Sequence, residues 1–176
     1  MCVIASDGGA LVQAELHGDG AVDSALPQAI AALLPHAPGG VVVVHGPGSY
    51  TGVRAGMAAA LGFAHARGLP LFTVGTLDVV AAGSDAGERG GWVVADAGRG
   101  AVYAQQIGSD AAVMSSPVRI TTGELAAKQL PVFCIDPPPG SGWLAVDAAA
   151  ALARAVPLAI ATGPVPRAEL RAVHVE

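Results

Sequence analysis

Residues 41–68, VVVVHGPGSYTGVRAGMAAALGFAHARG, place a buried type of strand, a glycine-rich corner and a smooth helix in a row. Four consecutive valines predict a short strand that is covered on both faces of its sheet. After the corner, residues 53–67 are rich in Ala and Gly, which predicts a helix against which another backbone packs closely. LPLFTV at 69–74 returns as a strand, so the β-α-β unit predicts a parallel crossover and an α/β fold.

The corner is glycine-rich, but its spacing matches no common phosphate or nucleophile motif. A P-loop needs a Gly-Lys pair, and none follows Gly46 or Gly48. Pro47 interrupts the spacing of a dinucleotide fingerprint, and the next strand ends without an acidic ribose ligand. A GxSxG nucleophile elbow is excluded because Pro47 and Thr51, not glycines, flank Ser49. We therefore interpret the corner as structural, with Ser49 and Thr51 as candidate helix caps.

Arg54 lies in the first turn of the predicted helix, where a cation is unfavourable beside the helix dipole. We interpret it as a group that meets an acidic side chain of a partner. A solvated surface arginine is the alternative. Gly52, two residues earlier, is expected to allow close approach of another chain segment.

The rest of the chain predicts two lobes. A hairpin at residues 2–16 opens the chain, and a helix with a cap at Asp23 or Ser24 follows. The Gly- and charge-rich loop 83–91 separates a first lobe, residues 1–90, from a second, residues 91–176. The further predicted elements are a helix at 75–82, a strand hairpin at 91–107, a helix from Thr121 or Thr122 to Leu130, a strand at 132–135 and a helix at 146–156.

Composition narrows the class of protein. Apolar residues make up 52% of the chain and charged residues 13%, which leaves little polar surface and favours a partner interface. No apolar run is long enough to cross a membrane. The net charge is −5 and the nine Lys and Arg are scattered, which disfavours strong direct nucleic-acid binding.

The cysteines and histidines indicate no redox or metal chemistry. Cys2 and Cys134 form no CxxC pair, so we expect buried small hydrophobes and a cytoplasmic protein. A reactive thiol is the alternative reading, but no neighbouring base is evident. The five histidines never fall at i,i+3 or i,i+4 spacing, so no metal is expected.

The string GPGSYTGVRAGMAAALGFA at 46–64 closely resembles the signature G-P-G-S-[FY]-T-G-[LV]-R of the bacterial TsaB family, also called YeaZ. Four further segments resemble parts of the family sequence, so the likeness spans nearly the whole chain. They are GLPLFTVGTLDVVAAG, DSALPQAIAALL, ADAGRGAVYAQQI and AELRAV. It implies an actin/hexokinase-like fold of two ribonuclease-H-like lobes. We expect the family's first strand, which ends in Asp-Thr-[Ser/Ala], to be missing, because Cys2-Val3-Ile4 aligns with the second strand.

The resemblance also implies a function. TsaB-type proteins act in making threonylcarbamoyladenosine next to the anticodon of tRNA. They pair with a larger TsaD-type paralogue, which holds a metal and performs the transfer, and a TsaE-type ATPase docks on the pair. By this resemblance the chain is a non-catalytic subunit without catalytic residues. It binds no cofactor alone, and ATP or ADP enters only at the assembled complex.

The resemblance assigns residues to three groups. The signature corner is Gly46, Pro47, Gly48, Ser49, Tyr50, Thr51, Gly52 and Arg54. The partner interface is Ser24, Leu26, Ile30, Gly56, Met57, Ala59, Ala60 and Leu61. The second-lobe hairpin contributes Asp96, Gly100 and Tyr103.

Some residues depart from the family pattern. Val44-His45 stands where the family usually has Gly-Arg, and Gly98-Arg99 shifts the hairpin arginine by one position. The His-x-x-x-His motif of the catalytic paralogue is absent from the sequence. Two alternatives stay open: an enzyme in its own right, either an actin-like phosphotransferase or a metallopeptidase, and a homodimer through the same two helices.

Overall fold

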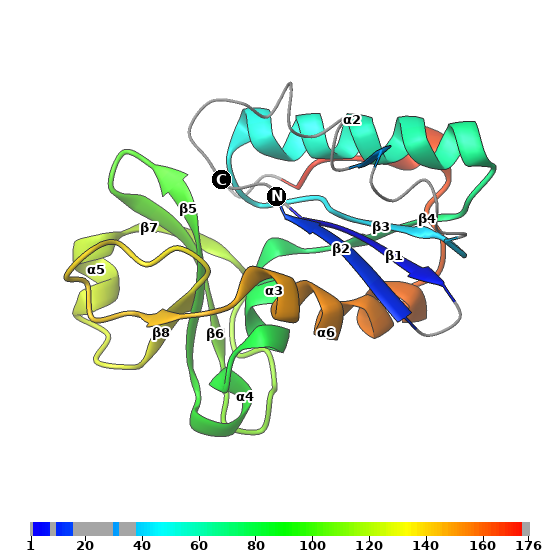
Figure 1. The fold of residues 1–176 in the computed structure, drawn as a ribbon. Coiled ribbons are helices and arrows are strands. Elements are labelled where there is room, and N and C mark those ends of the chain that lie inside the picture. The colour runs from blue at the N-terminus through cyan, green and yellow to red at the C-terminus, as the bar shows by residue number, and fades with distance from the viewer. Residues whose placement is uncertain (1, 8–9, 16–29, 32–37, 174–176) are drawn as a thin grey trace.

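The computed structural model describes residues 2–7, 10–15, 30–31 and 38–173, which build two sheets (Figure 1). The first sheet has the order β2-β1-β3-β4. Its strands are β1 (Cys2–Asp7), β2 (Ala10–Glu15), β3 (Val41–Val44) and β4 (Leu71–Val74). The predicted hairpin is confirmed, since β1 and β2 are antiparallel. The predicted parallel crossover is confirmed too, because β3 and β4 are parallel with Val41 opposite Leu71 and Val44 opposite Val74.

The second sheet has the order β7-β6-β5-β8-β9. Its strands are β5 (Gly91–Gly98), β6 (Ala101–Ile107), β7 (Val118–Thr121), β8 (Val132–Cys134) and β9 (Leu144–Ala145). β5 and β6 form the predicted hairpin, which is antiparallel, and β5 pairs in parallel with β8 on its other edge. β5 is therefore the central strand, flanked by a hairpin partner on one side and a parallel strand on the other.

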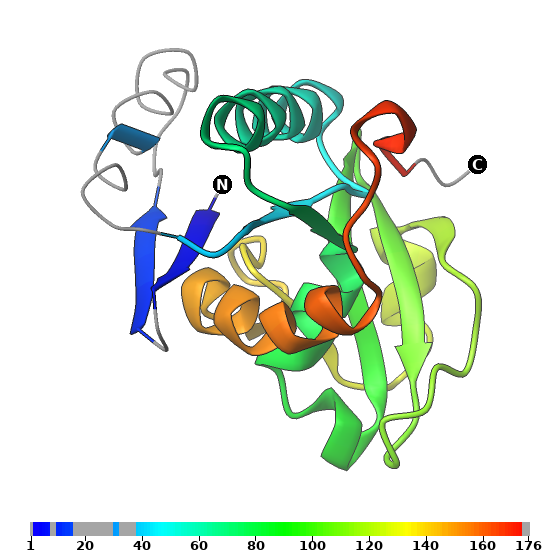
Figure 2. The ribbon, with the colours of Figure 1, turned by 90° about the vertical axis from the view of Figure 1, so that its right-hand side faces the viewer.

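Helices cover both faces of the first sheet (Figures 1 and 2). α2 (Tyr50–Arg67) lies on one face, and α3 (Thr76–Gly83) and α6 (Ala148–Ala161) lie on the other, between the two sheets. The shorter helices are α4 (Ala86–Arg89), α5 (Thr122–Ala126) and the 3-10 turn η1 (Arg167–Glu169). Within the described ranges, no helix is both long and apolar enough to cross a membrane.

β3 is covered on both faces, as its valine run predicts. Val41 and Val43 pack with Met57, Phe63 and other residues under α2. Val42 belongs to a second cluster that joins β4, α3, α6, β5 and β8, so one core connects the two sheets. Because successive side chains of a strand point to opposite faces, this split of consecutive valines between two clusters is the expected arrangement.

The C-terminal part of the chain returns to the first sheet. α6 contacts β4 and packs along α3, and the Val165 amide donates to the Leu71 carbonyl at 2.7 Å. Arg167 of η1 then reaches α2, where its Nη1 lies 2.9 Å from Nδ1 of His65. The second sheet begins at Gly91, next to the predicted division of the chain at residue 90. However, α6 belongs to the second half of the chain and packs beneath the first sheet. The division into two lobes therefore stays a prediction.

The bounds of two predicted helices need correction. The helix that starts after Thr121 ends at Ala126 instead of Leu130, and Gln129 has a positive φ of 52°, which a helix does not allow. The Ala-rich helix extends to Ala161, past Pro157, because its buried face continues to Ala159. The sequence did not predict β7, β9 or α4. In the first predicted helix, Ser24 and Leu26 lie outside the described residues.

Candidate functional site

The signature corner is a tightly held joint between β3 and α2. Gly46 has a φ of 102° and is followed by a cis peptide bond to Pro47. A Cβ added at Gly46 would lie 2.9 Å from the Val173 carbonyl oxygen, so only glycine fits. The Thr76 amide donates to the Gly46 carbonyl at 2.8 Å, and the Val173 amide donates to the His45 carbonyl at 2.7 Å. The start of α3 and the C-terminal segment therefore hold the corner from two sides.

Ser49 caps α2, as predicted. The Gly52 amide donates to its Oγ at 3.3 Å, and the Val53 amide donates to its carbonyl at 2.9 Å. Thr51, the other predicted cap, lies inside the helix, so that prediction is wrong. A Cβ at Gly52 would meet only the Ser49 side chain at ordinary contact distance, so no other chain segment approaches closely there.

Arg54 packs on its own helix. Its guanidinium carbon lies 4.0 Å from the centroid of the Tyr50 ring, one turn earlier. Tyr50 is 60% exposed and Arg54 is exposed as well. Such cation–π pairs contribute about 0.5–1 kcal/mol at exposed sites. The pair presents one positive and one aromatic group beside the corner, and a contact with an acidic partner group stays a prediction.

The residues predicted for the partner interface divide into two groups. Gly56, Met57 and Ala60 are buried within the chain, the last two in the cluster around Val41 and Val43. Ala59 and Leu61 are half-buried. Ile30 packs on the same cluster as Leu61, so the structure brings together the described part of the first predicted helix and α2. A role of these residues toward a partner stays a prediction.

The outward face of α2 carries no large side chains in its middle. Ala58, Gly62 and Ala66 are exposed, at spacings of one turn. A Cβ at Gly62 would have no heavy atom within 4 Å. The sequence predicted smooth sides for this helix, and the exposed members show which side is open.

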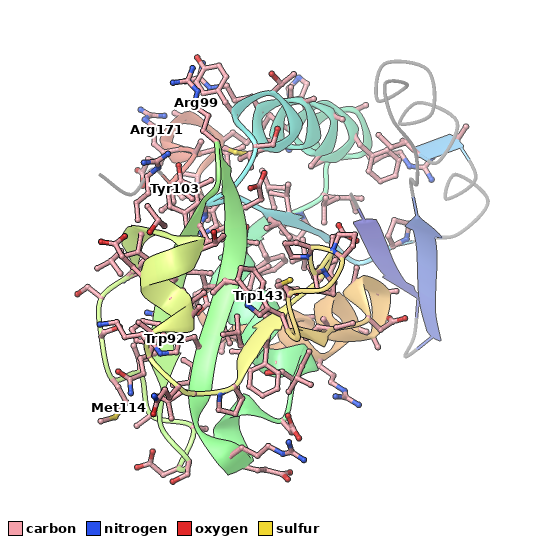
Figure 3. The ribbon with its side chains drawn as sticks, turned by 90° about the vertical axis from the view of Figure 1, so that its left-hand side faces the viewer. Trp92, Arg99, Tyr103, Met114, Trp143 and Arg171 are labelled. Carbon is pink, nitrogen blue, oxygen red and sulfur yellow. The ribbon has the colours of Figure 1, made fainter. Side chains whose placement is uncertain are left out.

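The second-lobe hairpin turns through three residues with positive φ. Gly98, Arg99 and Gly100 have φ values of 71°, 57° and 72°, and Asp96 Oδ1 accepts a hydrogen bond from the Gly98 amide at 3.0 Å. Figure 3 shows Arg99 at the end of this hairpin and Tyr103 farther along β6. Tyr103 stands opposite Arg119 of β7.

A cavity of about 440 Å³ lies between the two sheets, next to the corner. Pro47, Gly48 and Ser49 line it from the corner, and Asp96 and Asp136 line it from the second sheet. The structure thus brings the corner and Asp96 to one cavity, whereas Gly100 and Tyr103 are not part of its lining. The remaining lining is mostly apolar, from β3, α2, α3, β5, β8 and α6: Val42, Val43, Val44, Gly52, Val53, Gly56, Ala60, Thr76, Val79, Val80, Val94, Ala95, Cys134, Ile135, Ala148 and Leu152.

Asp136 was not among the predicted site residues. It directly follows the apolar run VFCI and precedes three prolines, a sequence that is typical of a turn. A carboxylate placed just beyond the carboxyl end of a parallel strand is the signal that would have found it, because ligand sites of α/β sheets lie at those ends.

Two titratable groups near the cavity have shifted pKa values. Burial, together with the nearby Asp136, raises the pKa of the Cys134 thiol to about 11, so it is protonated at neutral pH. This agrees with a buried small hydrophobe and not with a reactive thiol. Burial lowers the pKa of His45, against the opposing effect of Asp78. Among the described residues, no three His, Cys, Asp or Glu side chains are grouped to hold a metal ion.

Comparison with known proteins identifies the family. The family model TsaD, tRNA N6-adenosine threonylcarbamoyltransferase, matches residues 20–159. The chain belongs to this family. The signature corner resembles that of TsaB/YeaZ-type members, and the structural neighbours below share the fold.

Two solved structures share the fold over nearly the whole chain. An uncharacterized protein with similarity to peptidase YEAZ, from Pseudomonas aeruginosa, superposes with a TM-score of 0.71 at 19% identity, covering 99% of this chain and 94% of that one. YeaZ from Pseudomonas aeruginosa gives 0.68 at 21%, covering 99% and 93%. The expected actin-like α/β fold is therefore confirmed.

Curated relatives match over a shorter stretch. The uncharacterized proteins Rv3421c of Mycobacterium tuberculosis and Mb3455c of Mycobacterium bovis are each 48% identical over 63 residues, which is 36% of this chain. The match spans 28% of the length of these relatives.

Proposed function

We propose that this TsaB/YeaZ-like chain is a non-catalytic subunit in threonylcarbamoyladenosine modification of tRNA next to the anticodon. It pairs with a TsaD-type paralogue, and a TsaE-type ATPase docks on the pair. It acts in the cytoplasm and binds neither cofactor nor tRNA strongly by itself. ATP or ADP enters only at the assembled complex.

The open face of α2 carries the proposal. Ala58, Gly62 and Ala66 leave the middle of this 18-residue helix without large side chains on its outward face, while its other side is buried on the first sheet. Small residues allow a partner helix to approach closely. The exposed Tyr50 and Arg54 lie at the start of the helix, and aromatic and Arg side chains are enriched at protein interfaces.

The polar groups of the corner support a structural role for it. Ser49 Oγ caps α2, and the Gly46 and His45 carbonyls accept bonds from α3 and the C-terminal segment. The corner thus fixes where α2 begins and which side of the helix faces outward. In this proposal the signature sequence is required because it orients the interface helix.

The first test is assembly in solution. The purified chain is mixed with the TsaD-type paralogue of the same genome, and the mass is measured by light scattering behind a sizing column. A one-to-one or two-to-two complex is expected. Separate elution of the two folded proteins would contradict the pairing. A homodimer that dissociates when the paralogue is added would indicate competition for one face.

A matched pair of variants locates the interface. Ala58→Arg places a charge on the open face of α2, and we expect it to abolish the complex while the chain stays folded. Ala161→Arg, at the exposed end of α6, is the control and should leave the complex intact. If both variants assemble normally, the interface lies elsewhere.

The enzyme alternative is favoured by one observation, the cavity that joins Ser49 to Asp96 and Asp136. Equilibrium binding of ATP, ADP and zinc to the purified chain tests it. Nanomolar nucleotide or stoichiometric zinc would support a catalytic role for this chain alone. Binding of neither, with assembly intact, would support the subunit.

A further inference from the structure

Residues 163–173 form a C-terminal strap that runs alongside α2. After α6 the strap passes the edge of β4, where the Val165 amide donates to the Leu71 carbonyl at 2.7 Å. It then meets the last turn of α2 and returns along this helix to the corner at its start (Figures 1 and 2). One short segment therefore contacts both ends of an 18-residue helix.

The first anchor of the strap is at the last turn of α2. Arg167 Nη1 lies 2.9 Å from Nδ1 of His65, and Nη2 of the same guanidinium donates to the Ala64 carbonyl at 3.4 Å. The carbonyl groups of a last helical turn form the negative end of the helix dipole, where a cation is favourable. Arg167 therefore stabilises this end of α2 from outside the helix.

The second anchor is at the corner before α2. The Val173 amide donates to the His45 carbonyl at 2.7 Å, and the His45 ring is hydrogen-bonded to the backbone of Arg171. A Cβ on Gly46 would lie 2.9 Å from the Val173 carbonyl oxygen, so the strap passes directly over the corner. The strap therefore contacts the residues that set where α2 begins.

Between its anchors the strap is attached only lightly. Leu170 and Ala172 are half-buried and pack on the cluster beneath α2. Most other strap residues are exposed, including Pro166 and Ala168. Segments with few buried apolar contacts and exposed backbone hydrogen bonds open locally at a lower free energy than core strands. We therefore expect the strap to open while both sheets stay folded.

The strap has the local structure of a segment that moves as one piece. It begins at Gly163, which has a φ of 84° and is the most permissive kind of residue for a pivot. Pro164 and Pro166 follow, and each proline ring fixes its own φ. The Glu169 amide donates to the Pro166 carbonyl at 2.8 Å, a bond that does not involve α2. The strap therefore keeps its shape when its anchors open.

We infer that the C-terminal strap is a two-state device that controls how firmly α2 is held. In the closed state Arg167 and Val173 hold the two ends of the helix. In the open state the strap pivots at Gly163, and both anchors are lost together. The open face of α2 is the proposed pairing surface, so the closed strap favours pairing and pairing favours the closed strap. This last step rests on the proposed function, whereas the two-state behaviour of the strap does not.

Hydrogen exchange followed by NMR tests the two-state behaviour on the 176-residue chain. The Val165 and Val173 amides report opening of the strap, and the Val41 amide, which donates to the Pro70 carbonyl within the first sheet, is the reference. We expect protection of both strap amides to be similar and to be at least about tenfold below that of Val41. Protection of the strap amides equal to that of Val41 would overturn the inference, because the strap would then open only with the sheet.

A matched pair of variants tests whether the two anchors are coupled. Arg167→Ala removes only the anchor at the last turn of α2, and we expect protection of Val173, at the other end of the helix, to fall by about tenfold. Arg154→Ala removes an exposed arginine of α6 outside the strap and should leave Val173 unchanged. Unchanged Val173 protection in Arg167→Ala would overturn the inference, because the strap would then open piece by piece. Equal losses in both variants would overturn it too.

The same two variants test control of pairing. Calorimetry with the TsaD-type paralogue should show that Arg167→Ala weakens the complex by about fivefold or more, whereas Arg154→Ala does not change it. In the wild-type complex, exchange of the Val173 amide should be slower than in the free chain. Equal affinities of the two variants, with a stable wild-type complex, would overturn control of pairing by the strap. If the wild-type chain forms no complex, the proposed function fails, and the exchange experiments still decide whether the strap is a two-state device.

Discussion

The two sheets have a similar strand arrangement but differ in the strands at their centres. Each has an antiparallel hairpin, β1–β2 or β6–β7, next to a parallel pair, β3–β4 or β8–β9. In the second sheet the eight-residue strand β5 lies between these units and pairs with both. In the described part of the first sheet, hairpin and parallel pair meet directly at Ile4 and Val42. The two units are therefore adjacent in the described part of the first sheet, and Val42, Val43 and Val44 of β3 line the cavity.

The crossovers differ as well. In the first sheet the 18-residue helix α2 connects β3 to β4. In the second, a proline-rich segment without a helix connects β8 to β9, at residues 135–143. The helices that follow each parallel pair, α3 and α6, pack against each other in one shared core. The first sheet is therefore crossed by a long helix, whereas the second sheet contributes β5 and β8 to the shared core.

The largest expected effect is the loss of a core side chain from the second sheet. Phe133 of β8 is 2% exposed and belongs to the shared core, so Phe133→Ala should lower the free energy of unfolding by about 3–5 kcal/mol. Phe72 of β4 is only half-buried against the same core, and Phe72→Ala should cost clearly less. Urea unfolding followed by circular dichroism measures both. Equal losses would mean that the two sheets are equally well packed.

The contact between α3 and α6 gives the next largest effect. A Cβ added at Gly83 would overlap the Cβ of Ala151 and lie 2.8 Å from its Cα. Gly83→Ala should therefore push the two helices apart and destabilise the chain by about 1–3 kcal/mol.

Gly62→Ala is the matched control, because nothing lies within 4 Å of a Cβ there. This change should stabilise the chain by about 0.5–1 kcal/mol through helix propensity. Both values come from urea unfolding curves. A neutral Gly83→Ala would show that α3 and α6 have room to separate within the shared core.

Much of this fold could be predicted from local sequence. The valine run fixes β3 as a strand covered on both faces, and the Gly-Arg-Gly turn between apolar runs places the β5–β6 hairpin. β9 has only two residues, and most residues of β7 are exposed. Neither strand therefore shows the alternation of apolar and polar residues from which a strand is predicted. The similar strand arrangement of the two sheets could not be predicted, because the sequence shows no internal repeat. The order in which strands pair is set by contacts between residues that are distant in the sequence.

The site was predictable where backbone geometry demands particular residues. Gly46 and Ser49 could be assigned because a turn and a helix cap require them. The burial of Met57 and Ala60 could not be predicted, because a helix with small residues on all sides shows no preferred buried face. Asp136 joins the cavity only through the parallel pairing of β8 with β5, which the sequence alone does not specify.

A smaller effect is expected from His45, which follows β3 at the corner. Burial lowers its pKa below the ordinary 6.5, so the unfolded chain binds this proton more tightly than the folded chain. Stability is therefore full above about pH 6.5 and falls as the pH drops toward the lowered pKa. His45→Gln should flatten this part of the pH profile, measured by urea unfolding between pH 7.5 and 5.

The smallest effect concerns the turn between β5 and β6 in the second sheet. Arg99 has a φ of 57°, a conformation that costs a non-glycine residue roughly 1–2 kcal/mol. Arg99→Gly removes that cost but gives the unfolded chain more freedom, so the net gain should be at most about 1 kcal/mol. Arg99→Ala keeps the unfavourable φ and should give no gain. If thermal unfolding shows that Arg99→Gly destabilises the chain instead, the arginine side chain makes a contact that outweighs the strain, and the hairpin end is stabilised by more than its backbone.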